Sequence, residues 1–176
     1  MLRATNTGAT AVIGPDDPIR APSDVGDIHY ESELAVVIGR TASRVPRAEA
    51  ARHILGLTCL NDVTARDLQR KDVQYTRAKG FDTFAPIGPC IAVGLDPSRL
   101  TIEGWVNDER KQASSTDQLI FPVDQLVEFV TAVMTLHPGD VITTGTPSGV
   151  GPMKPGDRVM VKIEGIGSLS NPVVER

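Results

Sequence analysis

The segment HYESELAVVIG, from His29 to Gly39, is the feature that most limits how this chain can fold. Its second half is a run of aliphatic residues typical of a buried strand. Because side chains in a strand alternate between two faces, Glu31 and Glu33 share one face with His29. Two neighbouring carboxylates at the start of an apolar strand repel each other and resist dehydration. The segment therefore predicts either a metal site or an edge strand whose glutamates face water.

Composition limits the class of protein. The chain has 176 residues, 40% of them hydrophobic and 23% charged, so we expect one globular domain spanning residues 1–176. The net charge of -4 and the scattered lysines and arginines argue against nucleic-acid binding. We find no apolar run of bilayer length and no signal-peptide pattern, so we expect a cytoplasmic protein without a membrane segment. Cys59 is typical of a buried thiol, and neither Cys59 nor Cys90 is assigned a function.

The remaining apolar runs are short and are separated by turn-forming residues, which indicates strands. We expect strands at residues 57–60, 86–93, 100–106 and 111–115, a hairpin turn at 107–110 and a strand fragment at 11–13. Two Pro-Gly-Asp sequences, at 138–140 and 155–157, suit type II turns that lead into strands. Because helices and strands do not alternate regularly, we expect an α+β domain dominated by β structure and closed as a roll or distorted barrel.

Two helices are expected among these strands. The first covers residues 46–55, with proline in its first turn and Gly56 at its end. The second covers residues 123–134, where four apolar residues recur at helical spacing: Leu126, Phe129, Val130 and Val133. We expect this stripe to pack against the core, with Thr131 on the opposite face.

Asp62 adds a third carboxylate to the two glutamates. It follows the expected strand at 57–60, and functional side chains are commonly presented where a strand runs into a loop. Together with Glu31 and Glu33 it would form an all-oxygen site, which favours Mg²⁺, Mn²⁺ or Ca²⁺ over zinc. Three carboxylates leave coordination positions open for substrate oxygens, so such a site suits Lewis-acid catalysis better than purely structural binding.

Groups that can bind an anion follow Asp62. Arg66 and Gln69 are neighbours on a helical turn, and Lys79 lies in a charged segment further on. Each alone is more typical of a solvated surface, but their density beside a carboxylate cluster favours a site. His29 could be a metal ligand or a neighbour of the site, whereas we interpret the other two histidines, His53 and His137, as structural.

The segment TTGTPSGVG, at residues 143–151, matches neither a P-loop nor a nucleophile elbow. Its backbone N–H groups, such as that of Gly145, and the Thr146 hydroxyl could bind a carboxylate. An ordinary tight turn explains the same residues equally well.

Five segments in this order resemble the fumarylacetoacetate hydrolase family in its short prokaryotic form: HYESELAVVIG, NDVTARDLQ, KGFDTFAPIGP, LHPGDVITTGTPSGVGPMKPGD and IEGIGSLSNPV. The resemblance implies a Mg²⁺ or Mn²⁺ site made of Glu31, Glu33 and Asp62. It further implies catalytic and substrate-binding roles for Arg66, Gln69 and Lys79, and substrate binding at Gly145 and Thr146. Family members act on 2-oxo acids and their enols through hydrolytic C–C cleavage, decarboxylation or enol–keto isomerisation, which share an enolate that the metal stabilises.

The family usually carries a further segment resembling GxNYxxHAxE, whose His–Glu dyad activates water, and this sequence has no counterpart to it. Either the sequence is part of a longer chain or the protein lacks the dyad. Without the dyad, isomerisation or decarboxylation is favoured, while hydrolysis is the family default. We expect a homodimer, partly from the resemblance and partly because exposed sheet edges gain from being covered. The alternative from another class is a catalytically silent, metal-stabilised dimeric module.

Overall fold

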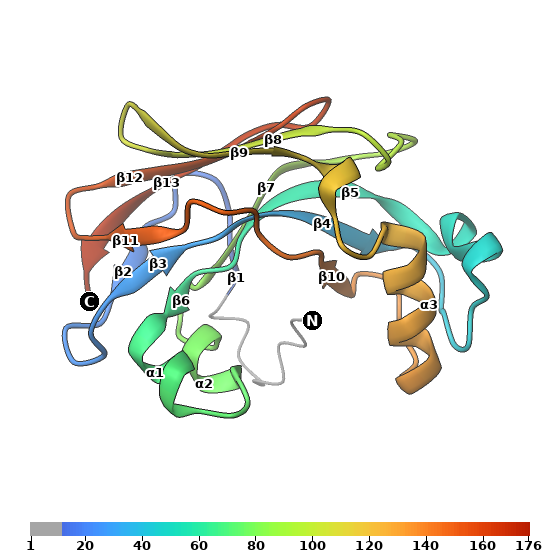
Figure 1. Ribbon diagram of the computed structural model, residues 1–176, viewed down its shortest axis with the longest axis horizontal. Coiled ribbons are helices and arrows are strands. Elements are labelled where there is room, and N and C mark those ends of the chain that lie inside the picture. Colours follow the sequence, from blue (N-terminus) through green and yellow to red (C-terminus); the bar gives the residue numbers. More distant parts are fainter. Residues whose placement is uncertain (1–11) are drawn as a thin grey trace.

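The computed structural model describes residues 12–176, which form three β-sheets with short helices at their margins (Figure 1). The expected α+β class dominated by strands is confirmed. Of the expected strand fragment at 11–13, Val12–Ile13 forms β1, and residue 11 lies outside the described residues. Among residues 12–176, no helix is both long enough and apolar enough to cross a membrane.

The central five-stranded sheet contains the aliphatic part of the HYESELAVVIG segment. Its order is β1-β7-β5-β4-β10, with β7 at Ala85–Ala92, β5 at Ile54–Asn61, β4 at Ser32–Ile38 and β10 at Val141–Thr143. Because β4 pairs with β5 on one side and β10 on the other, and all its residues are buried, the edge-strand alternative is wrong. Leu34, Val36 and Ile38 point into the main hydrophobic core. Glu33 therefore points to the opposite face of the strand.

A second five-stranded sheet packs over the first and closes the core between them (Figure 1). Its order is β2-β13-β12-β8-β9, formed by Ile19–Ala21, Gly167–Glu175, Arg158–Ile163, Thr101–Val106 and Glu109–Ser115. Leu57 from β5 and Val161 from β12 are each 1% exposed in this core. Truncating a buried leucine such as Leu57 to alanine costs about 2–5 kcal/mol of stability.

A third, small sheet extends the glutamate segment toward its N-terminal end. Its order is β11-β3-β6, with β11 at Gly151–Met153, β3 at Ile28–Tyr30 and β6 at Thr64–Ala65. Ile28 and Tyr30 bury their side chains in a second core cluster that also contains Phe84. Since β3 ends immediately before Glu31 and β4 begins immediately after it, Glu31 lies at the junction of two sheets.

The expected turns are found, with one shorter than predicted. Gly139 and Gly156 have φ of 92° and 96°, and the N–H groups of Asp140 and Asp157 donate to carbonyls three residues earlier, as type II turns require. The β8–β9 hairpin turns at Asn107 and residue 108 alone, because residues 109 and 110 already belong to β9.

The first expected helix is shorter than predicted and is a 3₁₀ helix. This helix, η1, covers Arg47–His53, and β5 begins at Ile54. Ile54 pairs with Ile38 of β4, and the Gly39 N–H donates to the His53 carbonyl at 2.8 Å. The helix therefore ends at His53, because the next residues pair with β4. Gly56 lies within β5 instead of ending a helix.

The second expected helix is present as α3, at Val123–Val133, but the predicted apolar stripe is wrong in part. Val130 is buried as expected, whereas Phe129 and Val133 are 69% and 71% exposed. Thr131, expected on the outer face, is 1% exposed, and its hydroxyl accepts a hydrogen bond from the Val45 N–H at 3.0 Å. The buried face of α3 is formed by Val123, Val127 and Val130 together with Thr131, so the helix faces the core with a different stripe from the predicted one.

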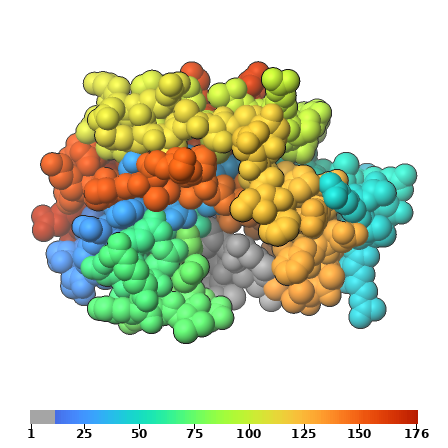
Figure 2. All heavy atoms as spheres, in the orientation of Figure 1, coloured from blue at the N-terminus to red at the C-terminus, as the bar shows by residue number. Residues whose placement is uncertain are grey.

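Two further helices, α1 at Arg66–Lys71 and α2 at Thr76–Lys79, fold from the polar stretch after β6. In the space-filling view, this region (green) and the α3 region (orange) project on the same side of the molecule, away from the β8–β9 hairpin (Figure 2). A last 3₁₀ helix, η2, covers Thr116–Gln118. As expected, Cys59 is buried, and its burial raises the pKa of the thiol to about 12.

Candidate metal and substrate site

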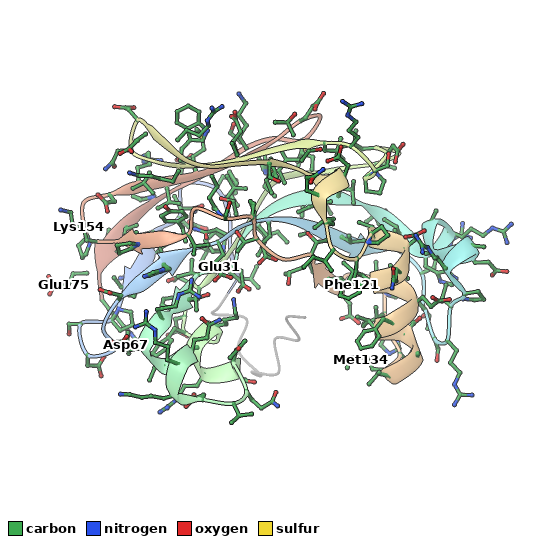
Figure 3. The ribbon with its side chains drawn as sticks, viewed as in Figure 1. Glu31, Asp67, Phe121, Met134, Lys154 and Glu175 are labelled. Carbon is green, nitrogen blue, oxygen red and sulfur yellow. The ribbon has the colours of Figure 1, made fainter. Side chains whose placement is uncertain are left out.

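Strand pairing brings the three predicted carboxylates together. Glu31 lies between β3 and β4, Glu33 lies in β4, and Asp62 follows β5, which pairs antiparallel with β4. The Asp62 N–H donates to the Glu31 carbonyl at 2.9 Å. One carboxylate oxygen from each residue lies within 4.8 Å of the others. The labelled Glu31 lies on the side of the sheet that faces α1 (Figure 3).

All three carboxylates are buried. Glu31, Glu33 and Asp62 are 7%, 2% and 6% exposed. Burial, and then the charge of Asp62, raise the pKa of Glu33 to about 8. Burial likewise raises the pKa of Asp62, although Lys79 acts in the opposite direction. Such a crowded, dehydrated group of acids binds either protons or a cation.

The donor set fits a divalent metal ion. Among residues 12–176, the buried Asp62 Oδ1 finds no hydrogen-bond partner, which is uncommon for a buried polar atom and leaves this oxygen available to a ligand. The donors are all carboxylate oxygens, the type that Mg²⁺ and Mn²⁺ prefer. Glu31, Glu33 and Asp62 could therefore hold such an ion together.

Two cations lie against this cluster. The Lys79 Nζ, at the end of α2, donates to Glu31 Oε2 at 2.9 Å and also to Asp62 Oδ2. The Arg66 Nη2, at the start of α1, donates to Glu31 Oε1 at 2.7 Å, and its Nη1 donates to the Gln69 side chain. Burial opposes the charged form of Lys79, but Asp62 and Glu31 outweigh it and raise the pKa of the ammonium. The structure thus brings Arg66 and Lys79 to the carboxylates, whereas Gln69 reaches the cluster only through its hydrogen bond with Arg66.

The segment at 144–150 lies along β4 and contacts the cluster from the other side. The Gly145 N–H donates to Glu33 Oε2 at 2.9 Å, and the Gly145 φ of 96° suits a residue without a side chain. The Thr146 hydroxyl donates to the Ser32 carbonyl at 3.0 Å. In this arrangement both groups are engaged within the protein, and their binding of substrate stays a prediction.

The histidines do not join the carboxylates. His29, in β3, is outside the cluster, and burial and then the charge of Arg66 lower its pKa. His53 Nδ1 lies 3.1 Å from the Thr41 carbonyl, and the His137 N–H donates to Asp140 in a turn. The ring contact of His53 agrees with a structural role, whereas the His137 contact is made by its backbone and the role of its imidazole stays a prediction.

Three polar residues that sequence reasoning missed support the site. The Asn61 Oδ1 accepts the Glu31 N–H at 3.0 Å, and the Thr64 Oγ1 accepts a hydrogen bond from Lys79 Nζ at 3.0 Å. Gln112, in β9, contacts both Ser32 and Thr146. For Asn61 and Thr64 the available signal was their position beside Asp62. For Gln112 it was an amide within a predicted strand.

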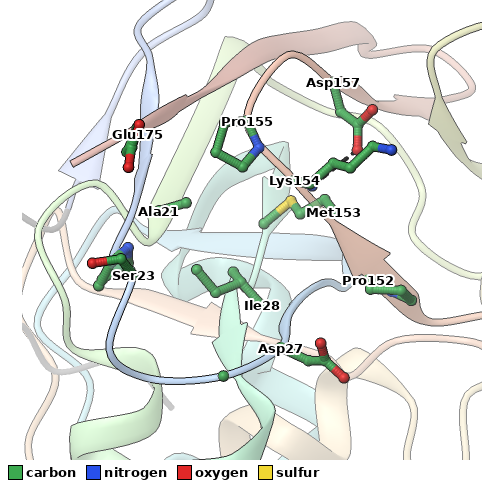
Figure 4. A pocket seen from close by; sticks show the side chains of 12 residues that line it. Ala21, Ser23, Asp27, Ile28, Pro152, Met153, Lys154, Pro155, Asp157 and Glu175 are labelled. Carbon is green, nitrogen blue, oxygen red and sulfur yellow. Dashed lines mark hydrogen bonds between the residues drawn. The ribbon is translucent and has the colours of Figure 1, made fainter.

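A separate open groove of about 630 Å³ lies at the opposite end of β3 from Glu31 (Figure 4). It is lined by residues of the β2–β3 connection, β11 and the end of β13, including Ile28, Met153 and Glu175. None of the three clustered carboxylates lines it. The chemistry of the candidate site therefore does not extend to this groove.

Two packed sheets carry a buried carboxylate cluster on the face of β4 that points away from the core between them, with a lysine and an arginine against the cluster. This arrangement defines a class of mainly β proteins with a candidate divalent-metal site. A sequence model described as "Fumarylacetoacetate (FAA) hydrolase C-terminal" matches residues 4–174. The chain belongs to the fumarylacetoacetate hydrolase family.

Its relatives include proteins from several bacteria. The chain is 52% identical to a protein of Mycobacterium tuberculosis, over 95% of this chain and 64% of that protein. It is 55% identical to a crystal structure named as the 5-carboxymethyl-2-hydroxymuconate delta-isomerase of Mycobacterium smegmatis. That comparison has a TM-score of 0.94 and covers 95% of this chain and 66% of the isomerase. The chain thus spans about two thirds of the length of these relatives.

Two further relatives bear on chemistry. An oxaloacetate tautomerase of Bacillus subtilis is 39% identical, over 92% of this chain and 58% of that enzyme. A maleylpyruvate hydrolase of Sphingobium sp. SYK-6, solved with manganese (II) and pyruvate, is 38% identical with a TM-score of 0.87. This alignment covers 94% of this chain and 62% of the hydrolase. Relatives of this chain therefore include tautomerase, isomerase and hydrolase enzymes.

Proposed function

We propose that this chain forms the catalytic domain, residues 1–176, of a Mg²⁺- or Mn²⁺-dependent enzyme that interconverts small dicarboxylic 2-oxo acids and their enols. The observation that carries the proposal is the buried cluster of Glu31, Glu33 and Asp62 with Lys79 and Arg66 against it. One Asp62 oxygen of this cluster has no hydrogen-bond partner within residues 12–176. Its relatives named as an oxaloacetate tautomerase and a muconate isomerase support the enol–keto reaction.

Glu31, Glu33 and Asp62 would hold the ion, because their oxygens converge and their charges are only partly offset by the two neighbouring cations. When bound, Mg²⁺ or Mn²⁺ would supply Lewis-acid polarisation to the oxygens of a 2-oxo acid. The manganese complex of the maleylpyruvate hydrolase supports the choice of ion.

Lys79 and Arg66 would hold the negative charge of the substrate. The Lys79 ammonium is 16% exposed in its side chain, so its charge acts in a partly dehydrated site where it is strongest. It would stabilise the negative charge that develops on the 2-oxo oxygen as the enolate forms. The Arg66 guanidinium has five N–H donors, of which two are engaged with Glu31 and Gln69. The others can bind a substrate carboxylate.

Tautomerisation moves one proton between the carbon next to the 2-oxo group and its oxygen, with no other reactant. Hydrolytic C–C cleavage shares the enolate but also consumes water and needs a base to activate it. Hydrolysis and decarboxylation are therefore the alternative outcomes at the same site, and hydrolysis is supported by the maleylpyruvate hydrolase relative.

The test is a substrate panel. Oxaloacetate enol, a 2-hydroxy-dienedioate and an acylpyruvate are assayed by ultraviolet absorbance and product analysis, with Mg²⁺, Mn²⁺ or EDTA. We expect the absorbance of the oxaloacetate enol to decay faster when the wild-type protein and metal are present. This acceleration should be absent with Glu33→Ala. Pyruvate release from the acylpyruvate would reassign the chain to hydrolysis. Metal binding without turnover of any acid would support the catalytically silent dimeric module.

A further inference from the structure

The buried side-chain amide of Gln112 connects β4 with the segment at 144–150, which contact each other at the carboxylate cluster. It lies in β9, the edge strand of the second five-stranded sheet, and is 1% exposed. Its Oε1 accepts the Ser32 N–H at 3.1 Å. Its Nε2 donates to the Thr146 Oγ1 at 2.9 Å and to the Pro147 carbonyl at 2.8 Å. The amide thus connects the strand that carries Glu33 with the segment that carries Gly145.

The surrounding backbone leaves space for this amide. Gly104 of β8 lies opposite Gln112, and a Cβ at Gly104 would lie 2.7 Å from Gln112 Oε1 and 2.4 Å from Ser32 Oγ. Gly149, with φ of 101°, has a similar role, because a Cβ there would lie 2.1 Å from the Lys111 carbonyl oxygen. Two glycines therefore allow the close approach of β9 to Ser32 and to the end of the segment.

The hydrogen-bond partners determine how the amide is oriented. The Ser32 N–H can only donate and the Pro147 carbonyl can only accept, so the oxygen of Gln112 must face Ser32. Because Nε2 donates to Thr146, the Thr146 hydroxyl must direct its own proton to another acceptor. That acceptor is the Ser32 carbonyl, at 3.0 Å. Gln112 thereby sets both the position of Thr146 and the direction of its O–H bond.

The same connection reaches the carboxylates. Ser32 is the residue between Glu31 and Glu33, so the Gln112 amide holds the backbone that separates them. On the other side of the amide, Gly145 donates its N–H to Glu33 Oε2 at 2.9 Å. A shift of the 144–150 segment would remove this donor from Glu33 and change the position of its carboxylate.

We propose that Gln112 is a positioning residue of the enzyme site, which aligns Thr146 and the Gly145–Glu33 contact with the carboxylate cluster. The proposal rests on the proposed function, because the aligned groups serve the 2-oxo acid reaction. Gln112 itself contacts no metal ligand side chain and acts through Ser32 and Thr146. Since misplacement of groups at a reacting centre by about 1 Å can cost a hundredfold in rate, its loss should appear mainly in turnover.

The test compares Gln112→Leu with a matched variant, Asn171→Leu. Asn171 is also a buried amide, 2% exposed, and donates to the Gly14 and Asp17 carbonyls, away from the carboxylates. Both substitutions remove the amide partner of two backbone groups and should lower the melting temperature. We expect kcat to fall on the order of a hundredfold in Gln112→Leu, with a much smaller change in KM. Asn171→Leu should keep the wild-type kcat.

The electron paramagnetic resonance spectrum of bound Mn²⁺ provides a second readout that does not need turnover. We expect an altered spectrum for Gln112→Leu and an unchanged one for Asn171→Leu. Should Gln112→Leu not fold, Gln112→Glu takes its place, because it keeps the shape and the acceptor for Ser32 but loses the donors to Thr146 and Pro147. We expect the same losses from it.

The outcomes separate the two proposals. A wild-type protein that binds Mn²⁺ but turns over none of the acids contradicts the proposed function, and the Mn²⁺ spectra then decide the role of Gln112. Wild-type kcat and an unchanged Mn²⁺ spectrum in the folded Gln112 variant overturn the positioning role while the proposed function stands. The positioning role is also overturned if kcat falls equally in Asn171→Leu or if the wild-type protein binds no Mn²⁺.

Discussion

The Lys79 Nζ lies 2.9 Å from the Glu31 Oε2, joining the end of α2 to the junction of β3 and β4. Both side chains are mostly buried, at 16% and 9% exposure. A buried charged pair is costly to form and gains little stability over an apolar pair, so its presence favours a role beyond folding. In this account the role is to place a cation where the substrate becomes more negative.

Replacing Lys79 by a neutral residue should lower turnover without lowering the affinity for the metal. Lys79→Met keeps most of the side-chain volume but removes the ammonium that contacts Glu31 and Asp62. Because a competing positive charge is lost, Mn²⁺ affinity should stay equal or increase. Turnover should fall on the order of a hundredfold to a thousandfold, as for other charge-stabilising donors.

Calorimetry with Mn²⁺ and assays on the best substrate check both parts. Lys71→Met, on the exposed end of α1, is the control and should keep wild-type turnover. Loss of Mn²⁺ binding in Lys79→Met, or full activity, would show that Lys79 does not serve the substrate.

Metal should stabilise the fold. The three buried carboxylates repel one another when no cation lies between them, and a ligand that binds only the native state raises its stability by mass action. At a concentration one hundred times Kd, this amounts to about 2.7 kcal/mol. We expect Mg²⁺ to raise Tm and EDTA to lower it. The difference in Tm between Mg²⁺ and EDTA should be much smaller in Glu33→Gln. A wild-type Tm that EDTA does not change speaks against the site.

The metal-free protein should lose stability as pH rises. The pKa of Glu33 is raised from 4.5 to about 8 in the folded protein. Between these values the folded state holds the proton more tightly than the unfolded state. The stabilisation of the fold by protonated Glu33 is therefore fully present below about pH 4.5 and is lost as the pH rises to about 8. Thermal unfolding in EDTA across this range should show a decline that is smaller in Glu33→Gln. Equal slopes for the two proteins contradict the raised pKa.

Strand periodicity predicted part of the carboxylate cluster that the structure shows. Glu31 and Glu33 were placed on one face by alternation alone, and Asp62 by its position at a strand end. Both inferences depend on residues close to one another in sequence. The edge-strand alternative could be rejected only when the pairing of β4 with β5 and β10 was known, since pairing partners are distant in the sequence.

Contacts over long sequence distances explain what the sequence could not show. Thr131 is buried, and its hydroxyl accepts the Val45 N–H while its carbonyl accepts the Arg44 N–H. The predicted stripe therefore placed Phe129 and Val133 wrongly, because both are exposed. Gln112 reads as an ordinary strand residue until the outer sheet places it against Ser32 and Thr146. Polar contacts of this kind leave no periodic signal in a single sequence.

We expect the chain to form a homodimer. Phe129 and Val133 on α3, together with Phe121 before it, are 69%, 71% and 53% exposed, and Phe121 is labelled beside α3 in Figure 3. Covering these side chains with a second copy would remove them from water. Sedimentation velocity should show a dimer at micromolar concentration that Phe129→Glu weakens. A wild-type monomer contradicts the dimer, and an unaffected Phe129→Glu dimer contradicts the use of this face.

The central claim is that Glu31, Glu33 and Asp62 together bind a divalent cation. The most direct measurement is calorimetric titration of EDTA-treated, dialysed protein with Mn²⁺, for the wild type and for Glu33→Ala. We expect one Mn²⁺ per wild-type chain and a large loss of affinity in Glu33→Ala, because one of three anionic donors is removed. A folded wild-type protein that binds no Mn²⁺, or a Glu33→Ala variant that binds it as tightly, would contradict the claim.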